Sequence, residues 1–188
     1  MHLPFSGGLI RSCQPGDSDS LAREADNRNI WLTVRDRFPH PYTRAHAEAW
    51  IDRVTSDRPE THFAIDLGAG AVGGIGLELQ KDVSRYSAEL GYWLGQAHWG
   101  RGIMTAAVSR FTAYAFETFD LCRIYGLVFE TNPASQRVLE RAGYALEGRL
   151  RRAVYKDGQI LDQFLYAVSH PPRLPHLPSC EGMDIAPS

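Results

Sequence analysis

The sequence has few cysteines, and they form no pairing pattern. Only 3 of its 188 residues are cysteine, Cys13, Cys122 and Cys180, and none belongs to a C-x-x-C pair. A small, odd set of widely spaced cysteines is typical of reduced thiols and argues against a disulfide framework or a zinc site. The histidines also lack H-E-x-x-H or any other paired ligand spacing. We therefore expect a cytoplasmic protein with no metal.

The sequence also lacks a charge bias and a long hydrophobic run. Lys and Arg together number 20 and Asp and Glu 22, which gives a formal net charge of -2. Such a balance provides no general attraction to nucleic acid or to an anionic membrane. No apolar stretch approaches the ~18 residues that a membrane span requires. Residues 1–8 lack the basic and apolar regions of a secretory signal. We expect neither nucleic acid nor membrane as a partner.

Length and composition predict one folded domain followed by a tail. A chain of 188 residues, 44% of them hydrophobic and 11% aromatic, can bury a substantial core. From His170 onward prolines recur and large apolar residues are few, which disfavours both helix and sheet. We expect a domain at 1–169 and a proline-rich tail at 170–188, either loose or laid across the domain or a neighbouring subunit.

Periodicity and turn residues predict an alternation of helices and strands. Strands are expected at 8–13, 61–67, 71–79, 87–94, 124–129, 144–155 and 160–168, and helices at about 17–25, 30–34, 44–54, 103–118 and 133–142. Thr43 and Asn132 are the expected caps of the third and last helices. Asp157-Gly158 suits a tight turn between the last two strands. This order predicts an α+β fold, a mixed sheet of about six to seven strands flanked by helices.

The most informative stretch is residues 99–105, Trp-Gly-Arg-Gly-Ile-Met-Thr, which follows an expected strand. Gly100 and Gly102 let the backbone approach a ligand, and the next helix begins with free N–H groups, so a phosphate or pyrophosphate would fit. Alone, the pattern is equally typical of a plain glycine turn. A P-loop is excluded because Gly-Lys-Ser/Thr is missing, and the dinucleotide fingerprint needs glycine where Thr105 stands. A second glycine cluster, 73–76, indicates a strand bulge.

Five segments, in this order, resemble the Gcn5-related N-acetyltransferases (GNAT), specifically the subgroup that includes the ribosomal-protein alanine acetyltransferases (the RimJ/RimL type). The segments are FPHPYT with AWI at 38–51, VGGIGL at 72–77, AELGYWL at 88–94, WGRGIMT at 99–105, and NPAS to RAGY at 132–144. The resemblance implies the GNAT acyl-CoA N-acyltransferase fold and acetyl transfer from acetyl-CoA to a primary amine, on a protein N-terminus or a small molecule, by a monomer or homodimer. A non-catalytic CoA-binding or sensing module is the alternative.

The resemblance also assigns contacts with acetyl-CoA. The pyrophosphate-binding segment of the family matches Gly100, Arg101, Gly102, Ile103, Met104 and Thr105. The backbone of Leu94 would pair with the pantetheine arm, and Asn132 and Ser135 would face that arm and the sulfur. The family often has Gln or Arg where Trp99 stands, and Gly or Ala where Met104 stands. Tryptophan before the glycine is familiar in this subgroup, whereas Met104 is expected to alter the packing near the phosphates.

Acetyl transfer needs a base for the amine and a hydrogen-bond donor for the departing thiolate. Glu89 stands among apolar residues of a strand, where a carboxylate is costly unless it is functional, paired or exposed. We take Glu89 as the candidate base, with a surface or salt-bridge residue as the alternative. Many family members have a tyrosine acid at the position of Leu139. Ser135 is therefore the candidate donor, unless it only starts a helix, and Tyr155 is the second choice.

Aromatic residues of the N-terminal half are candidates for the acceptor pocket. The resemblance places this half on the substrate side, so Trp31, Phe38 and Tyr42 could contact the acceptor, together with Tyr155 near the last turn. Packing in the core is the alternative for each of them, because aromatic side chains are buried in most folds.

Overall fold

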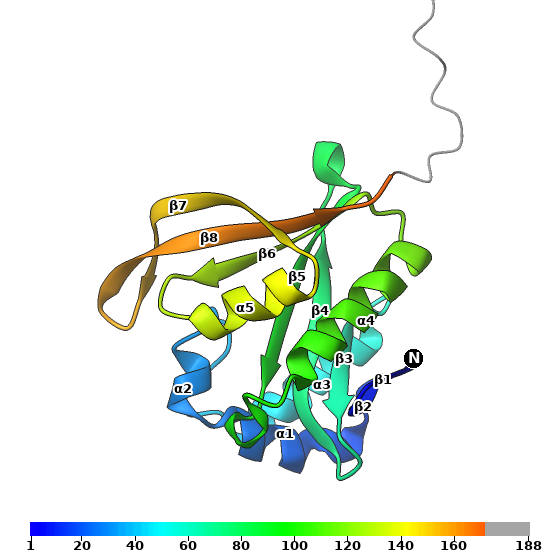
Figure 1. The fold of residues 1–188 in the computed structure, drawn as a ribbon. Coiled ribbons are helices and arrows are strands. Elements are labelled where there is room, and N and C mark those ends of the chain that lie inside the picture. The colour runs from blue at the N-terminus through cyan, green and yellow to red at the C-terminus, as the bar shows by residue number, and fades with distance from the viewer. Residues whose placement is uncertain (172–188) are drawn as a thin grey trace, which may run out of the picture.

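In the computed structural model, which describes residues 1–171, eight strands form one sheet (Figure 1). The order is β1-β2-β3-β4-β5-β6-β8-β7, and all neighbours are antiparallel except β5 and β6. The strands are β1 His2–Phe5, β2 Gly8–Arg11, β3 His62–Asp66, β4 Ala71–Leu79, β5 Ser87–Leu94, β6 Arg123–Phe129, β7 Ala145–Lys156 and β8 Gln159–Ser169. The helices are α1 Ser18–Ala25, α2 Arg28–Trp31, α3 Arg44–Ser56, α4 Ile103–Thr118 and α5 Pro133–Arg141. The predicted α+β class, a mixed sheet flanked by helices, is confirmed.

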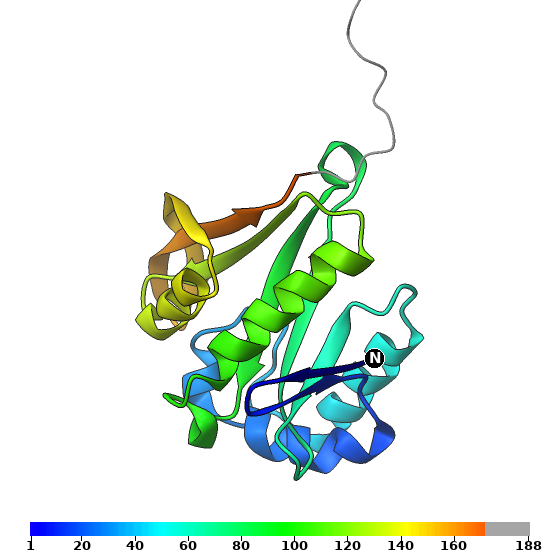
Figure 2. The ribbon, with the colours of Figure 1, turned by 45° about the vertical axis from the view of Figure 1, so that its right-hand side comes forward.

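Helices cover both faces of the sheet. Alternate side chains of β3 pack against different helices, which shows that the helices lie on opposite faces. Phe63 and Ile65 belong to a buried cluster with α4 and with Leu139 of α5. Ala64, between them, belongs to a second cluster with α1 and α3. Because successive side chains of a strand point to opposite faces, the two clusters lie on opposite sides of the sheet. Figure 2 shows α4 running along its face of the sheet.

The α4 and α5 helices form where the sequence predicts them. Buried residues of α4 recur at helical spacing, at Ile103, Met104, Ala107, Val108, Phe111, Thr112 and Ala115. In α5, Asn132 caps the first turn by accepting from the N–H of Ser135 at 3.0 Å, and Pro133 occupies the first position. The predicted cap Thr43 likewise accepts from the N–H of His46, at 3.3 Å.

The structure adds a strand and shortens two predicted elements. The sequence predicts no strand before residue 8, but His2–Phe5 forms β1 at the edge of the sheet, where Pro4 is tolerated because an edge strand has unpaired N–H positions. The first predicted strand, 8–13, ends at Arg11. The helix expected at 30–34 is the single turn α2, and the Thr33 hydroxyl, bonded to the Ile30 carbonyl at 2.8 Å, competes with its continuation.

The bulge predicted at 73–76 lies one residue earlier. Asp66 of β3 pairs with Ala71 and Ile65 pairs with Gly73, so Val72 is the extra residue of β4. Gly73 is required for a different reason, because a Cβ there would lie 2.5 Å from the carbonyl oxygen of Trp93. The close approach of β4 and β5 therefore depends on glycine.

Most of the predicted tail lies outside the described residues, as does Cys180. The division at residue 169 thus stays a prediction, although β8 ends at Ser169. Within residues 1–171, no helix has the length and apolarity to cross a membrane.

Asp17 is the N-cap residue of α1, but its side chain makes no cap hydrogen bond to the helix and forms an ion pair instead. Its carboxylate accepts two hydrogen bonds from the Arg11 guanidinium, at 2.7 and 2.8 Å, and one from the N–H of Gln14 at 2.8 Å. The same guanidinium donates to Asp66 of β3 at 2.8 Å. All three charged side chains are largely buried. This cluster ties the segment before α1 to β2 and β3.

We predict that Asp17→Ala destabilises the fold by about 3–5 kcal/mol, because it removes one partner of a buried ion pair and leaves Arg11 partly uncompensated. Chemical denaturation monitored by circular dichroism would measure this change. Asp19→Ala is the matched control, since Asp19 forms an exposed pair with Arg44 and its loss should change stability little. Equal effects of the two variants would contradict the prediction.

Candidate active site

The β5 and β6 strands separate near the middle of the sheet, as Figure 1 shows. Their parallel pairing covers only three pairs and ends at Glu89 and Tyr125, so residues 90–94 of β5 are not paired with β6. A cavity of about 1260 Å³ lies there. It is lined by the middle strands, the glycine turn, the start of α4, the exposed side of α5 and the loop that joins α2 to α3. The gap in the sheet connects the two faces of the molecule.

The glycine turn lies at one end of the cavity. Gly100 and Gly102 have φ of 74° and 76°, in the left-handed region that favours glycine. Gly102 is the N-cap of α4 and supplies no side-chain cap, so the N–H groups of Ile103, Met104 and Thr105 have no acceptor within the helix. A 16-residue helix also concentrates positive dipole charge at this end. The site suits an anion.

Trp99 holds the glycine turn against β5. Its indole Nε1 donates to the carbonyl of Leu94 at 2.7 Å, which joins the end of β5 to the start of the turn. The predicted cofactor-binding residues are thereby brought together: Leu94, Gly100, Gly102, Ile103, Met104 and Thr105 all line the cavity. Arg101 is exposed and lies outside the lining. Met104 is buried in the core below the turn.

Ser135 and Tyr92 face each other from α5 and β5. Their hydroxyls share a hydrogen bond of 2.8 Å, and the Tyr92 hydroxyl also lies 3.3 Å from the Ser135 carbonyl oxygen. Burial raises the pKa of Tyr92 well above its ordinary value, so this phenol stays protonated at neutral pH. No motif in the sequence marks Tyr92 as a functional residue. Its one signal is the alternation along β5, which places Tyr92 with Leu90 and Leu94 on the α4 and α5 face.

Glu89 lies on the opposite face of β5 and lines the cavity. Its side chain is 16% exposed and its Oε1 accepts from the Arg35 guanidinium. The cross-strand neighbour of Glu89 is Glu78 of β4, which forms an ion pair with Arg37 at 2.8 Å. Nε2 of His62 lies 3.4 Å from the Glu78 carboxylate, but burial lowers the pKa of His62 and disfavours its charged form. Burial opposes the charge of Glu78, but Arg37 prevails and holds the pKa of that carboxyl below its ordinary value. Two like charges are thus tolerated side by side because each has a basic partner.

Of the four aromatic residues predicted to contact the acceptor, two line the cavity and two do not. Phe38 and Tyr42 line it, with ring centroids 4.8 Å apart, and Phe38 also packs edge-on against Trp93 of β5. Trp31 is outside the lining, and the Lys156 ammonium packs over the face of its ring in a cation–π contact. Tyr155 is 68% exposed and lies outside the lining too, because it points to the outer side of the β7–β8 hairpin. The structure does not bring Tyr155 into the site.

Metal ligands are not gathered here. Over residues 1–171, no group of three or more His, Cys, Asp or Glu side chains is arranged to hold a metal ion.

Comparison with known proteins shows to which family the chain belongs. The profile described as "Acetyltransferase (GNAT) domain" matches residues 9–145. The chain is 36% identical over 165 residues to the "Putative ribosomal N-acetyltransferase YdaF" of Bacillus subtilis (strain 168), covering 85% of this chain and 89% of that relative. It is 31% identical over 170 residues to the "Probable N-acetyltransferase YjcK" of the same organism, covering 86% and 93%.

A solved structure supports the same assignment at the level of the fold. Mycobacterium smegmatis RimJ in complex with CoA-disulfide superposes with a TM-score of 0.77 at 24% identity, covering 90% of this chain and 86% of that one. The chain therefore belongs to the GNAT acetyltransferase superfamily, in its RimJ/RimL-like subgroup, and is an acetyl-CoA-dependent N-acetyltransferase.

Proposed function

We propose that this protein transfers the acetyl group of acetyl-CoA directly to a primary amine, with Glu89 as the base and Ser135 as the hydrogen-bond donor for the departing sulfur. One observation carries the proposal. The gap between β5 and β6 joins the glycine turn and Ser135 on one face of the sheet to Glu89 on the other. A donor bound on the first face can meet an amine that approaches from the second.

The residues of the donor side fit acetyl-CoA. The N–H groups at the start of α4 suit its pyrophosphate, and a Cβ at Gly100 or Gly102 would meet no atom within 4 Å, so the turn has open space beside it. The unpaired edge of β5 at residues 91–94 can hydrogen-bond the amide groups of the pantetheine arm. Bound acetyl-CoA would supply a thioester, whose carbonyl carbon bonds to the amine while its C–S bond breaks.

The side chains at the gap move the protons. Glu89 accepts a proton from the ammonium of the acceptor, directly or through water, and so frees the lone pair that attacks. Ser135 donates a hydrogen bond to the sulfur, and Tyr92 keeps the Ser135 hydroxyl in place. From ammonium to amide the nitrogen loses two protons: Glu89 takes one before the attack, and the other leaves after the C–N bond forms and ends on the departing sulfur. Glu89 then returns its proton to solvent, so atoms and charges balance.

The relatives named as ribosomal acetyltransferases support a protein N-terminus as acceptor, and the cavity volume allows a small amine as well. A CoA-binding or sensing module without catalysis would bind the donor and transfer nothing. Glu89 and Ser135 on either side of one gap favour the enzyme.

For Glu89→Gln we predict a fall in kcat of about 10²–10³-fold, since an amide cannot accept the proton. Steady-state assays would measure the rate and isothermal titration the affinity for acetyl-CoA, which should stay within about twofold because the donor binds on the other face. Glu147→Gln, at an exposed pair with Arg123 outside the cavity lining, is the control and should leave both unchanged. An unchanged pH–rate profile in Glu89→Gln would remove Glu89 from the mechanism.

We predict that Ser135→Ala lowers kcat about tenfold by removing the hydrogen bond to the sulfur, a loss of about 1.4 kcal/mol. Tyr92→Phe should lower kcat less, and the double variant should match Ser135→Ala, because Tyr92 acts through Ser135. Tyr114→Phe is the control, since Tyr114 packs with Phe63 and Phe111 away from the cavity. Additive losses in the double variant would show that Tyr92 acts independently.

We expect Gly102→Ala to weaken acetyl-CoA binding about tenfold, because a side chain at φ 76° is strained by about 1–2 kcal/mol and shifts the first N–H groups of α4. Isothermal titration would measure the dissociation constant. The control is Gly148→Ala, where φ is not positive and the new Cβ meets nothing within 4 Å. If the unaltered protein gave neither heat nor a thermal shift with millimolar acetyl-CoA, the proposed function would be wrong.

A further inference from the structure

Three consecutive side chains of the loop between α2 and α3 each form an ion pair with a different strand. Arg35 pairs with Glu89 of β5, Asp36 with Lys156 of β7 at 2.6 Å, and Arg37 with Glu78 of β4 at 2.8 Å. We call residues 35–37 the charged clasp. It spans the part of the cavity that lies over Glu89.

The middle pair of the charged clasp is the anchor. The side chain of Lys156 is only 2% exposed, and its Nζ lies 3.8 Å from the centroid of the Trp31 ring in addition to its pair with Asp36. A buried ammonium with two partners is costly to separate from them. Asp36 itself is 68% exposed, so the anchor depends on the burial of Lys156 and on its contact with Trp31, the last residue of α2 before the loop.

In the two arginine pairs the guanidinium is the more exposed member, since Glu89 is 16% exposed and Glu78 37%. The side chains of Arg35 and Arg37 are 45% and 62% exposed, and exposed ion pairs contribute little to stability because water and salt compete for both partners. Both guanidinium groups line the cavity and are accessible to a ligand that offers another acidic partner.

The Arg35–Glu89 pair lies where the amine of the acceptor has to arrive, if Glu89 is the base of the proposed function. The ammonium of an amine without an acidic group would form an ion pair with Glu89 in place of Arg35. The Arg35 guanidinium would then have no acidic partner and would lie beside a second positive charge. A molecule with both an ammonium and a carboxylate can enter between Arg35 and Glu89. Two ion pairs then replace one, and no charge loses its partner.

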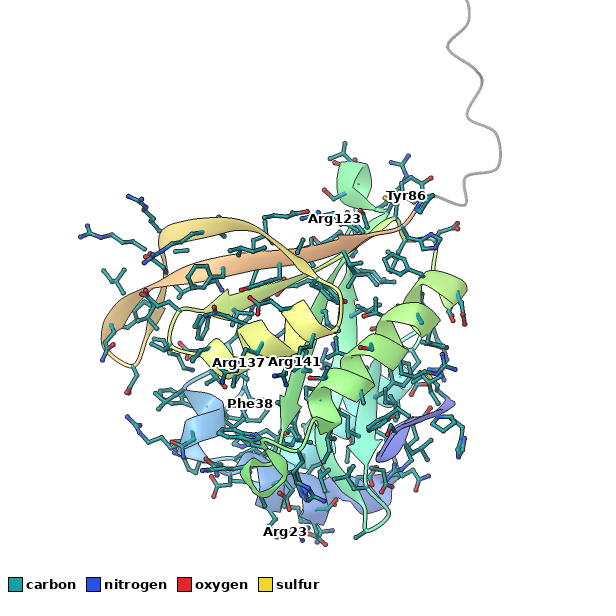
Figure 3. The ribbon with its side chains drawn as sticks, viewed as in Figure 1. Arg23, Phe38, Tyr86, Arg123, Arg137 and Arg141 are labelled. Atoms are coloured by element: carbon teal, nitrogen blue, oxygen red, sulfur yellow. The ribbon has the colours of Figure 1, made fainter. Side chains whose placement is uncertain are left out.

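The charge of the whole lining favours the same kind of molecule. Basic side chains outnumber acidic ones in it: Arg35, Arg37, Arg53, Arg137, Arg141 and Lys156 against Glu78, Glu89 and Asp157. In Figure 3, Arg137 and Arg141 are labelled below α5, between that helix and Phe38. Arg137 and Arg141 belong to α5 on the donor side, and without them the lining has four basic and three acidic side chains. This small positive surplus disfavours a polycationic amine.

We propose that the acceptor is a zwitterion, a primary amine with a carboxylate close by, and that Arg35 determines this specificity by binding the carboxylate while the ammonium binds Glu89. A free α-amino acid has this chemistry, and so does a peptide whose N-terminal residue is Asp or Glu. The inference rests on the proposed function and narrows its acceptor.

The test measures kcat/KM for matched amines that differ in one carboxylate. One arm compares alanine with alaninamide, and the other compares peptide amides that begin with Glu, Gln or Lys; spermidine serves as the polycation. We expect at least a tenfold preference for the carboxylate member in one of the two arms, which identifies the source of the zwitterion. Arg35→Gln should reduce this preference to within twofold, and Arg35→Lys should keep part of it.

Two controls separate specificity from folding. Arg23→Gln should leave the preference unchanged, since Arg23 lies on α1 at the bottom of Figure 3, outside the cavity lining. The affinity of Arg35→Gln for acetyl-CoA, measured by isothermal titration, should equal that of the unaltered protein.

The outcomes distinguish this inference from the proposed function. Acetylation with no preference for the carboxylate, with a preference for spermidine or the Lys peptide, or with a preference that survives Arg35→Gln, would overturn the inference alone. If none of the amines were acetylated, the proposed function would fail and the inference with it.

Discussion

The early end of the pairing between β5 and β6 is the constraint on which the site depends. In a fully paired sheet, ladder hydrogen bonds would occupy the backbone of residues 90–94, and the two faces would have no connection. The α5 helix packs at this opening: a Cβ on Gly126 of β6 would approach Leu139 of α5 to 3.2 Å, and the Tyr92 hydroxyl reaches Ser135. The α5 helix thus packs against both strands beside the opening where they part.

Charge compensation organises the face opposite α5. Cross-strand neighbours Glu78 and Glu89 would repel each other, and the charged clasp supplies a guanidinium to each. The clasp is held on two sides of the cavity: Asp36 pairs with Lys156 of the β7–β8 hairpin, and Arg35 and Arg37 pair with Glu89 of β5 and Glu78 of β4. The acceptor side is therefore assembled from parts of the chain that are far apart in sequence.

Local patterns predicted what depends on local physics. The caps Thr43 and Asn132 and the positive φ of Gly100 and Gly102 follow from the backbone preferences of these residue types, so the sequence indicated the helix starts and the glycine turn correctly. The partner of Ser135 and the charges over Glu89 arise from tertiary packing, which no spacing along the chain encodes. Tyr155 was misplaced for the same reason: the sequence gives the alternation of a strand but not which face is covered.

The account is tested most directly by a crystal structure of the protein with CoA. It predicts the pyrophosphate on the N–H groups that begin α4, the pantetheine arm along residues 91–94 of β5, and the sulfur within hydrogen-bonding distance of the Ser135 hydroxyl, in the gap that leads to Glu89. A CoA bound elsewhere, or a sulfur that points away from the gap, would contradict it.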